Sequence, residues 1–199
     1  LPVATALADY LVGTSLDETL SGGAGDDWVR GALGRDRIEG GSGNDQLDAR
    51  DGGDTFGGGT GNDSITLAGA GNTVLFAAGD GQDRVTSLDW SVGNTLSLAP
   101  GIVPGQVTVA WVSASAGLAP TELRLAIGGA ADAVVIVGST AAGGWQTAVD
   151  RVRFADGTEW SRAEMLGRAN AATAGADLIA DLSGTDVLNA GGGNDVLFG

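Results

Sequence analysis

A nine-residue period occupies the N-terminal third of the chain and limits what this chain can fold into. Six consecutive units cover residues 13–66, and they read GTSLDETLS, GGAGDDWVR, GALGRDRIE, GGSGNDQLD, ARDGGDTFG and GGTGNDSIT. The sixth position is always acidic: Glu18, Asp27, Asp36, Asp45, Asp54 and Asp63. The eighth is always apolar: Leu20, Val29, Ile38, Leu47, Phe56 and Ile65. A short fixed period is typical of a solenoid, in which stacked repeats bury one residue each.

The composition narrows the chemistry that such a solenoid supports. The 199 residues include 36 glycines, no histidine and no cysteine, every basic residue is an arginine, and the net charge is −15. Without His or Cys, the common zinc, copper and haem ligand sets are excluded. The negative charge disfavours nucleic acid and anionic membranes, so we expect neither nucleic-acid binding nor membrane insertion. Oxygen ligands remain, which favour hard cations such as Ca²⁺ or Mg²⁺.

The nonapeptides resemble the GGxGxDxUx repeat of RTX proteins. That resemblance implies a right-handed parallel β-roll, in which each unit is a glycine-rich turn followed by a short strand. Two units form one coil, so turns on one edge recur with every second unit. Glycine permits positive φ and lets backbone carbonyls converge on an ion, while aspartate supplies charge. The eighth-position residue is expected to point into the core.

The two edges of this roll differ in how complete their turns are. Asp27, Asp45 and Asp63 lie on one edge in the turns GGAGDD, GGSGND and GGTGND, whereas the opposite turns carry Ala32, Ala49 and Arg50 in place of glycine. We therefore expect well-formed sites on the first edge and weaker or empty ones opposite. The candidate metal-binding residues are Gly22, Gly23, Ala24, Gly25, Asp27, Asp36, Gly40, Gly41, Ser42, Gly43, Asp45, Asp54, Gly58, Gly59, Thr60, Gly61, Asp63, Asp83, Asp177, Asp186 and Asp195.

The period slips after Thr66 and returns near the C-terminus. We assign Thr73 to the place of the acid in residues 67–77, and two extra residues precede AGDGQDRVT, where Asp83 follows Asp63 by 20 positions. Because this spacing differs from 18, the sequence alone does not decide whether Asp63 and Asp83 share a site. A second run places Asp177, Asp186 and Asp195 at the same nine-residue spacing. A full site at its last turn would need sequence beyond this chain.

Residues 88–170 lack the nonapeptide and predict short strands. We expect strands at 95–98, 106–112, 122–127, 133–137 and 149–154, a turn at Asp156-Gly157, and a further strand at 158–160. Ser161 and Glu164 form a capping box that opens a short helix through Leu166. The stretch VDRVRFADGTEWSRAEML resembles the haemolysin-type calcium-binding related region that follows RTX blocks.

These patterns predict an all-β protein with four segments. They are a lead-in (1–12), a β-roll (13–87), a β-rich module with a short helix (88–170) and the start of a second, incomplete roll (171–199). Because the chain begins at Leu1 and stops within a repeat, we expect it to be a piece of a larger protein. The resemblance implies a secreted or cell-surface bacterial protein, with calcium ions, flanking repeats and the type I secretion machinery as partners.

The function expected from this organisation is structural, with Ca²⁺ driving folding after secretion. An alternative is an adhesive or carbohydrate-binding module that uses residues 88–170, with the five tryptophans as a stacking platform. Packing explains those tryptophans more simply. No catalytic activity is expected: without His no hydrolytic triad exists, and the carboxylates Asp150, Asp156 and Glu159 read more simply as turn residues than as a glycosidase pair.

Overall fold

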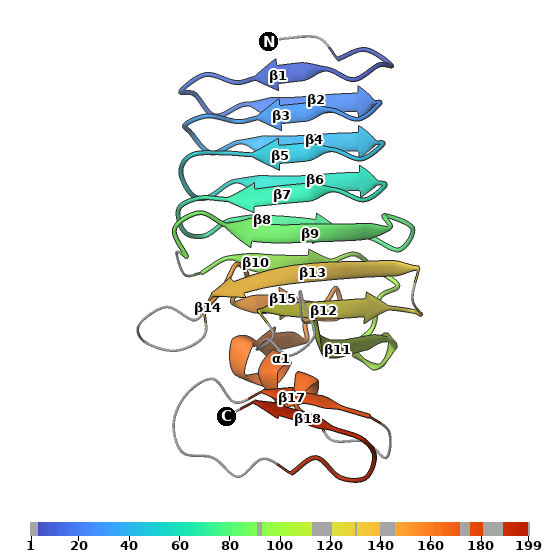
Figure 1. The fold of residues 1–199 in the computed structure, drawn as a ribbon. Coiled ribbons are helices and arrows are strands. Elements are labelled where there is room, and N and C mark those ends of the chain that lie inside the picture. The colour runs from blue at the N-terminus through green and yellow to red at the C-terminus, as the bar shows by residue number, and fades with distance from the viewer. Residues whose placement is uncertain are drawn as a thin grey trace.

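The computed structural model describes residues 4–90, 93–112, 121–129, 131–139, 146–171, 176–180 and 189–198. Two β-sheets lie face to face and form a roll whose coils stack along one axis, with a single α-helix among the described residues, near the C-terminal end (Figure 1). The parallel β-roll that the resemblance to RTX repeats implies is confirmed.

One sheet has nine strands. Its first five are parallel, and the last three along its path form an antiparallel meander that joins the roll through the parallel pair β9 and β13. In spatial order the strands are β1 (Tyr10–Val12), β3 (Trp28–Arg30), β5 (Gln46–Asp48), β7 (Ser64–Leu67), β9 (Gln82–Ser87), β13 (Asp132–Ser139), β12 (Glu122–Ile127) and β11 (Val107–Val112), with β14 (Gln146–Thr147) beside β13.

The facing sheet has seven strands. In spatial order they are β2 (Thr19–Ala24), β4 (Arg37–Ser42), β6 (Thr55–Thr60), β8 (Thr73–Phe76), β10 (Thr95–Leu98), β15 (Arg151–Arg153) and β16 (Glu159–Ser161). Leu20 pairs with Ile38, and Ile38 with Phe56, so one coil is two nonapeptides, as predicted. Later coils are longer than two nonapeptides, because Ser64 pairs with Arg84 and Thr73 with Thr95.

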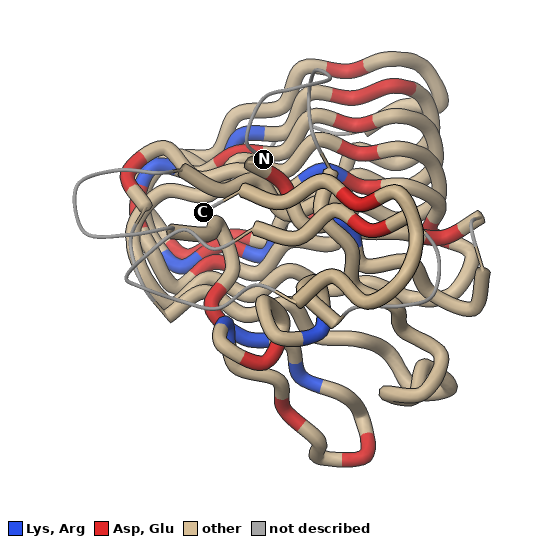
Figure 2. Tube along the Cα trace, turned by 60° about the horizontal axis from the view of Figure 1, so that its bottom comes forward, with Lys and Arg blue, Asp and Glu red and all other residues tan. Residues whose placement is uncertain are grey.

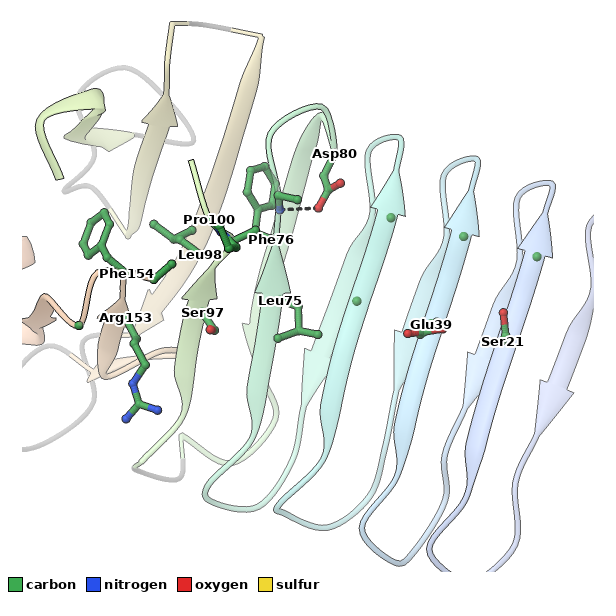
Figure 3. A pocket seen from close by; sticks show the side chains of 18 residues that line it. Ser21, Glu39, Leu75, Phe76, Asp80, Ser97, Leu98, Pro100, Arg153 and Phe154 are labelled. Carbon is green, nitrogen blue, oxygen red and sulfur yellow. Dashed lines mark hydrogen bonds between the residues drawn. The ribbon is translucent and has the colours of Figure 1, made fainter. Parts of the chain in front are cut away.

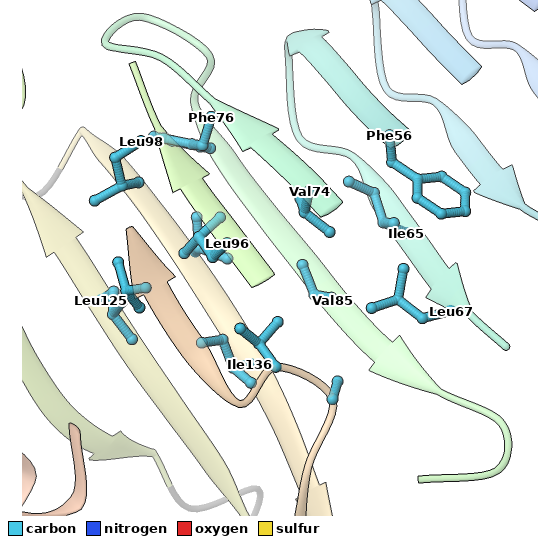
Figure 4. Close-up of a cluster of buried hydrophobic side chains, with 14 of the residues drawn as sticks. Phe56, Ile65, Leu67, Val74, Phe76, Val85, Leu96, Leu98, Leu125 and Ile136 are labelled. Atoms are coloured by element: carbon cyan, nitrogen blue, oxygen red, sulfur yellow. The ribbon is translucent and has the colours of Figure 1, made fainter. Parts of the chain in front are cut away.

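The core lies between the sheets and is built from the eighth-position residues (Figure 4). Strands alternate buried and exposed side chains, as a period of two requires. At most 4% of the surface of each of these side chains is exposed: Leu11, Leu20, Val29, Ile38, Leu47, Phe56, Ile65, Val74, Val85 and Leu96. Each stabilises the fold by about 1.5–3 kcal/mol through burial. The same cluster continues into Leu125, Ile136 and Val152.

The strands β10 to β16 extend both sheets of the roll. The predicted strands at 95–98 and 122–127 have the observed bounds, while the one expected at 149–154 is shorter. After the turn at Asp156-Gly157, Trp160 is buried against Phe154, with ring centroids 4.7 Å apart. A short 3₁₀ helix (Pro104–Gln106) precedes β11.

The helix α1 (Arg162–Ala169) begins at the predicted capping box, where the Glu164 amide donates to Ser161 Oγ at 3.3 Å. It extends beyond Leu166, where it was expected to end. Asn170, directly after the helix, contacts the second repeat run, because its Nδ2 donates to Ala180 O at 2.8 Å. It also contacts β11, where Trp111 Nε1 donates to Asn170 Oδ1 at 2.6 Å. In that run β17 (Leu178–Ala180) pairs in parallel with β18 (Val196–Phe198), and Leu178 lies opposite Val196, again two nonapeptides further along the chain.

Candidate metal-binding turns

The sixth-position aspartates form two buried columns, one along each edge of the roll. Asp27, Asp45, Asp63 and Asp83 make up the first column, and Asp36 and Asp54 belong to the second; at most 3% of each residue is exposed. Acidic segments stack coil upon coil along an edge of the roll in Figure 2. Each of these aspartates lies directly before a strand, except Asp83, which is inside β9, so the strand register sets the spacing of the carboxylates.

Within a column, one carboxylate oxygen is held by the backbone of the preceding coil. The Asp27 amide donates to Asp45 Oδ1 and the Asp45 amide to Asp63 Oδ1, both at 2.8 Å. The Asp63 amide makes the same bond to Asp83 Oδ1 at 3.0 Å, although the spacing there is 20 residues. The two inserted residues are therefore absorbed in the loop, and Asp83 stays in line with Asp63.

The second carboxylate oxygen is different. Among the described residues, the Oδ2 atoms of Asp27, Asp36, Asp45, Asp54, Asp63 and Asp83 are buried and lack a hydrogen-bond partner. Burial, followed by repulsion from neighbouring carboxylates of the column, raises the pKa of Asp54 and Asp63 to about 6 and that of Asp83 to about 8. Burying an unpaired acceptor costs free energy, so each Oδ2 needs a bound cation or a proton to offset that cost.

Glycines surround these oxygens so tightly that no side chain fits beside them. A Cβ on Gly40 would overlap Asp45 Oδ2 and lie 2.6 Å from Gly58 O. Gly41, at φ +122°, packs against Gly23 O in the same way. No group of three or more acidic side chains converges on one point in the described ranges, so an ion here needs backbone carbonyls as well. This mixture of carboxylate and carbonyl oxygens is what Ca²⁺ prefers, and the residues fit that ion.

The opposite edge keeps the carboxylates but changes their surroundings. Ala32 has φ +78°, a left-handed conformation that costs a residue with a Cβ free energy. The Arg35 side chain lies over Gly53, and its charge partly offsets the raised pKa of Asp54. Asp51 Oδ2 accepts from the Gly34 amide at 3.1 Å. Oδ2 of Asp36 and Asp54 is as unpaired as on the first edge, so the two edges differ in turn backbone and local charge.

The assignment of Thr73 to the acid's place was wrong. Asn72 occupies it, 18 residues after Asp54, and Asn72 Oδ1 accepts from the Asp54 amide at 2.9 Å. Thr73 lies in β8 and pairs with Thr55 and Thr95. The column then continues, because the Asn72 amide donates to Asn94 Oδ1 at 3.0 Å. Counting two nonapeptides on from Asp54 would have found Asn72, but the longer loop before Asn94 hides that residue.

Two further features escaped the sequence reasoning. Residues 4–12, ATALADYLV, carry Asp9 and Leu11 at the sixth and eighth places of a glycine-free unit, and the Asp9 amide donates to Asp27 Oδ1 at 2.7 Å. At the fifth position a second ladder runs along the surface: the Asn44 amide donates to Asp26 Oδ1 at 2.7 Å, and the Asn62 amide to Asn44 Oδ1 at 2.9 Å. In the sequence, the Asp or Asn that recurs directly before the sixth-position acid indicates this ladder.

The second run shows the same contact once. The Asp177 amide donates to Asp195 Oδ1 at 3.0 Å across the β17 and β18 pair, and both residues are half-buried. Asp186 lies outside the described residues.

Away from the turns, a shallow groove of about 800 Å³ crosses the outer face of the seven-stranded sheet. Figure 3 shows Ser21, Glu39, Leu75, Ser97 and Arg153 along it on successive strands. Gly57 completes this row between Glu39 and Leu75, and a Cβ there would meet nothing within 4 Å.

Of the four tryptophans in the described ranges, Trp111 and Trp160 are buried, and Trp28 is 41% exposed. Trp28 packs edge-on against Tyr10 and lies under the Arg30 guanidinium. Trp145 is outside the described residues.

The three carboxylates considered as a catalytic pair, Asp150, Asp156 and Glu159, bond to other groups of the protein. Asp150 Oδ2 accepts from the Gly93 amide at 2.5 Å, and Glu159 pairs with Arg153 at 2.8 Å. Asp150 and Glu159 line one small depression, and Asp156 bonds the Thr158 amide at 2.8 Å in its own turn.

A parallel β-roll with glycine turns and columns of buried carboxylates defines a calcium-binding repeat module. The family model of the RTX calcium-binding nonapeptide repeat matches residues 12–47, 31–65 and 172–199, and that of the haemolysin-type calcium-binding protein related domain matches residues 122–164. The repeats thus belong to the RTX family, and Ca²⁺ is their ion. No curated protein matches the chain. None of the helices in the described part of the chain is long and apolar enough to cross a membrane.

Proposed function

We propose that Ca²⁺ binding at the repeat turns drives folding of the β-roll, and that the chain serves as a structural module of a secreted bacterial protein. The observation that carries this proposal is the set of six buried Oδ2 atoms that have no hydrogen-bond partner within the described part of the chain. Without a cation these carboxylates oppose the folded state, because burial and mutual repulsion both act on them. With Ca²⁺ they become ligands.

The proposed ion sites lie between consecutive turns of the first column. Asp27, Asp45, Asp63 and Asp83 would supply carboxylate oxygens, and the glycine carbonyls of the GGxGxD turns would supply the rest. An aspartate inside the column faces a turn on either side, so it would serve two neighbouring sites and couple them. Sites at Asp36 and Asp54 are proposed to be weaker, since Ala32 and Arg35 disturb the turns.

The proposed place of folding is outside the cell. Extracellular Ca²⁺ is millimolar, and sites with dissociation constants of about 10⁻⁴–10⁻³ M would fill there while staying empty in the cytosol. An unfolded chain suits passage through a type I secretion channel, and flanking repeats of a longer protein would stack on the ends of the roll. RTX repeat proteins are typically secreted.

Far-UV circular dichroism during a Ca²⁺ titration tests the coupling. We expect a strand signal in excess chelator that is clearly below that of the folded chain, a cooperative rise in Ca²⁺, and a far smaller response to Mg²⁺, which accepts such carbonyl-rich geometry poorly. A fully folded spectrum in chelator, or equal responses to both ions, would contradict the proposal.

A second candidate function is binding of a carbohydrate or protein partner, which the groove over Gly57 favours. Glycan-array binding by the full chain, abolished by Gly57→Leu with an unchanged circular dichroism spectrum, would support it. Binding that Gly57→Leu leaves intact would exclude this groove.

We expect no turnover of glycosides or esters, and a hydrolase screen checks that expectation.

A further inference from the structure

Asn72 takes the place of an aspartate in the second column but bonds differently. Its Oδ1 accepts from the Asp54 amide at 2.9 Å, as the aspartate Oδ1 atoms do with the backbone of their own preceding coils. Its Nδ2 donates to two carbonyls of its own turn, Ala68 O at 3.0 Å and Gly69 O at 3.1 Å. The bond accepted by Oδ1 and the two bonds donated by Nδ2 fix the orientation of the Asn72 side-chain amide.

The aspartate turns place an oxygen where Asn72 has its nitrogen. Because Oδ1 makes the same contact in both, Oδ2 of Asp54 and its neighbours corresponds to Asn72 Nδ2. An amide nitrogen facing carbonyl oxygens forms hydrogen bonds, whereas a carboxylate oxygen facing them is repelled unless a cation lies between. This accounts for the contrast between Asn72, whose amide is fully bonded, and Asp54, whose Oδ2 is buried and unpaired.

Asn94 continues the same arrangement toward the C-terminus. Its Oδ1 accepts from the Asn72 amide at 3.0 Å, and its Nδ2 donates to Ala148 O at 3.1 Å. The Asp150 amide donates to Asn94 O at 2.9 Å. Two buried asparagines thus fill the column between Asp54, which precedes β6, and Asp150, which precedes β15.

We infer that Asn72 and Asn94 take the place of the cation on this edge, so that β8, β10, β15 and β16 of the seven-stranded sheet fold without Ca²⁺. The inference rests on the proposed function and adds to it the order in which the strands fold. These four strands would form an ion-independent platform, and β6, β4 and β2 would assemble on it as Ca²⁺ binds.

Asn72→Asp in the full chain tests this inference, with hydrogen exchange measured in excess chelator. We expect amide protection in β8 (Thr73–Phe76) to fall by about tenfold or more, since one buried acceptor loses its partners. Asn62→Asp is the matched control: it adds the same charge at an exposed position where Asp26 already makes the equivalent bond. Its β8 protection should match the wild type.

The reverse substitution guards against a variant that merely fails to fold. Asp54→Asn extends the amide arrangement by one coil, so protection of β6 in chelator should rise. Unchanged β8 protection in Asn72→Asp, an equal loss in Asn62→Asp, or no gain in Asp54→Asn would each overturn the inference. All these readings are made without Ca²⁺, so a wild-type chain that failed to bind calcium would refute the proposed function and leave this comparison standing.

Discussion

The strands before residue 88 and those after residue 93 share one core but satisfy their buried polar groups in opposite ways. In the first region the unpaired buried side-chain oxygens all belong to aspartates, and no such atom occurs in the described residues beyond Asp83. In the second, Asn94 and Thr147 are buried and hydrogen-bonded within the protein. The same kind of sheet thus leaves carboxylate oxygens unpaired in one region and bonds its buried amide and hydroxyl groups within the protein in the other.

The largest effect is expected where a carboxylate is shared by two turns. Asp45→Ala removes a ligand from sites on both sides and should raise the Ca²⁺ concentration at half folding by about tenfold or more. Asp54→Ala lies on the edge disturbed by Ala32 and Arg35 and should raise it less. Circular dichroism titrations of both variants give the comparison, and equal shifts would refute the asymmetry of the edges.

A glycine pair tests the turn backbone separately from the charge. Gly41→Ala places a Cβ against Gly23 O at a positive φ and should cost about 3 kcal/mol of stability in Ca²⁺. Gly57→Ala, one strand away with open space around it, should change stability by less than about 0.5 kcal/mol. Thermal unfolding measures both, and similar losses would show that the packing of the turn carbonyls is unimportant.

A smaller effect is expected from pH in calcium-free buffer. Asp63 and Asp83 have folded pKa values of about 6 and about 8, above the ordinary value of 3.8, so the folded roll binds more protons than the unfolded chain. Stability without calcium should therefore fall as the pH rises from about 4 to about 8, and strand signal should return on acidification. Circular dichroism with EDTA follows this, and a stability that rises over that window would contradict the account.

The smallest effect belongs to the ion-independent region. Ser161→Ala removes the N-cap of α1 and should cost about 1 kcal/mol, equally with and without Ca²⁺. Hydrogen exchange in Arg162–Ala169 measures the loss. If that loss appeared only without Ca²⁺, the two regions would be coupled far more tightly than their bonding indicates.

The period, together with the resemblance to RTX repeats, predicted most of the roll, because position eight must be apolar and position six acidic in every stacked unit. Leu20, Ile38 and Phe56 therefore lie where the spacing places them. The strand at 122–127 and the capping box at Ser161 follow local rules and were also predictable. Local patterns do not reveal partners, however, and the parallel pairing of β13 with β9 depends on tertiary packing.

Part of the candidate site was less accessible to sequence reasoning. Asn72 does not match an acidic motif, although it fills the same position, and Asp9 lies in a unit without glycine. The fifth-position ladder through Asn44 was overlooked because turn chemistry explains Asn and Asp without any partner. In each case the role depends on a residue in the neighbouring coil, which a single unit does not show.

Hydrogen exchange of the intact chain, resolved by region, tests the central claim most directly. In excess chelator we predict fast exchange in β2, β4 and β6 and slow exchange in β10, β12 and α1, with Ca²⁺ slowing exchange in the first group only. Slow exchange in β2, β4 and β6 without Ca²⁺ would contradict the account.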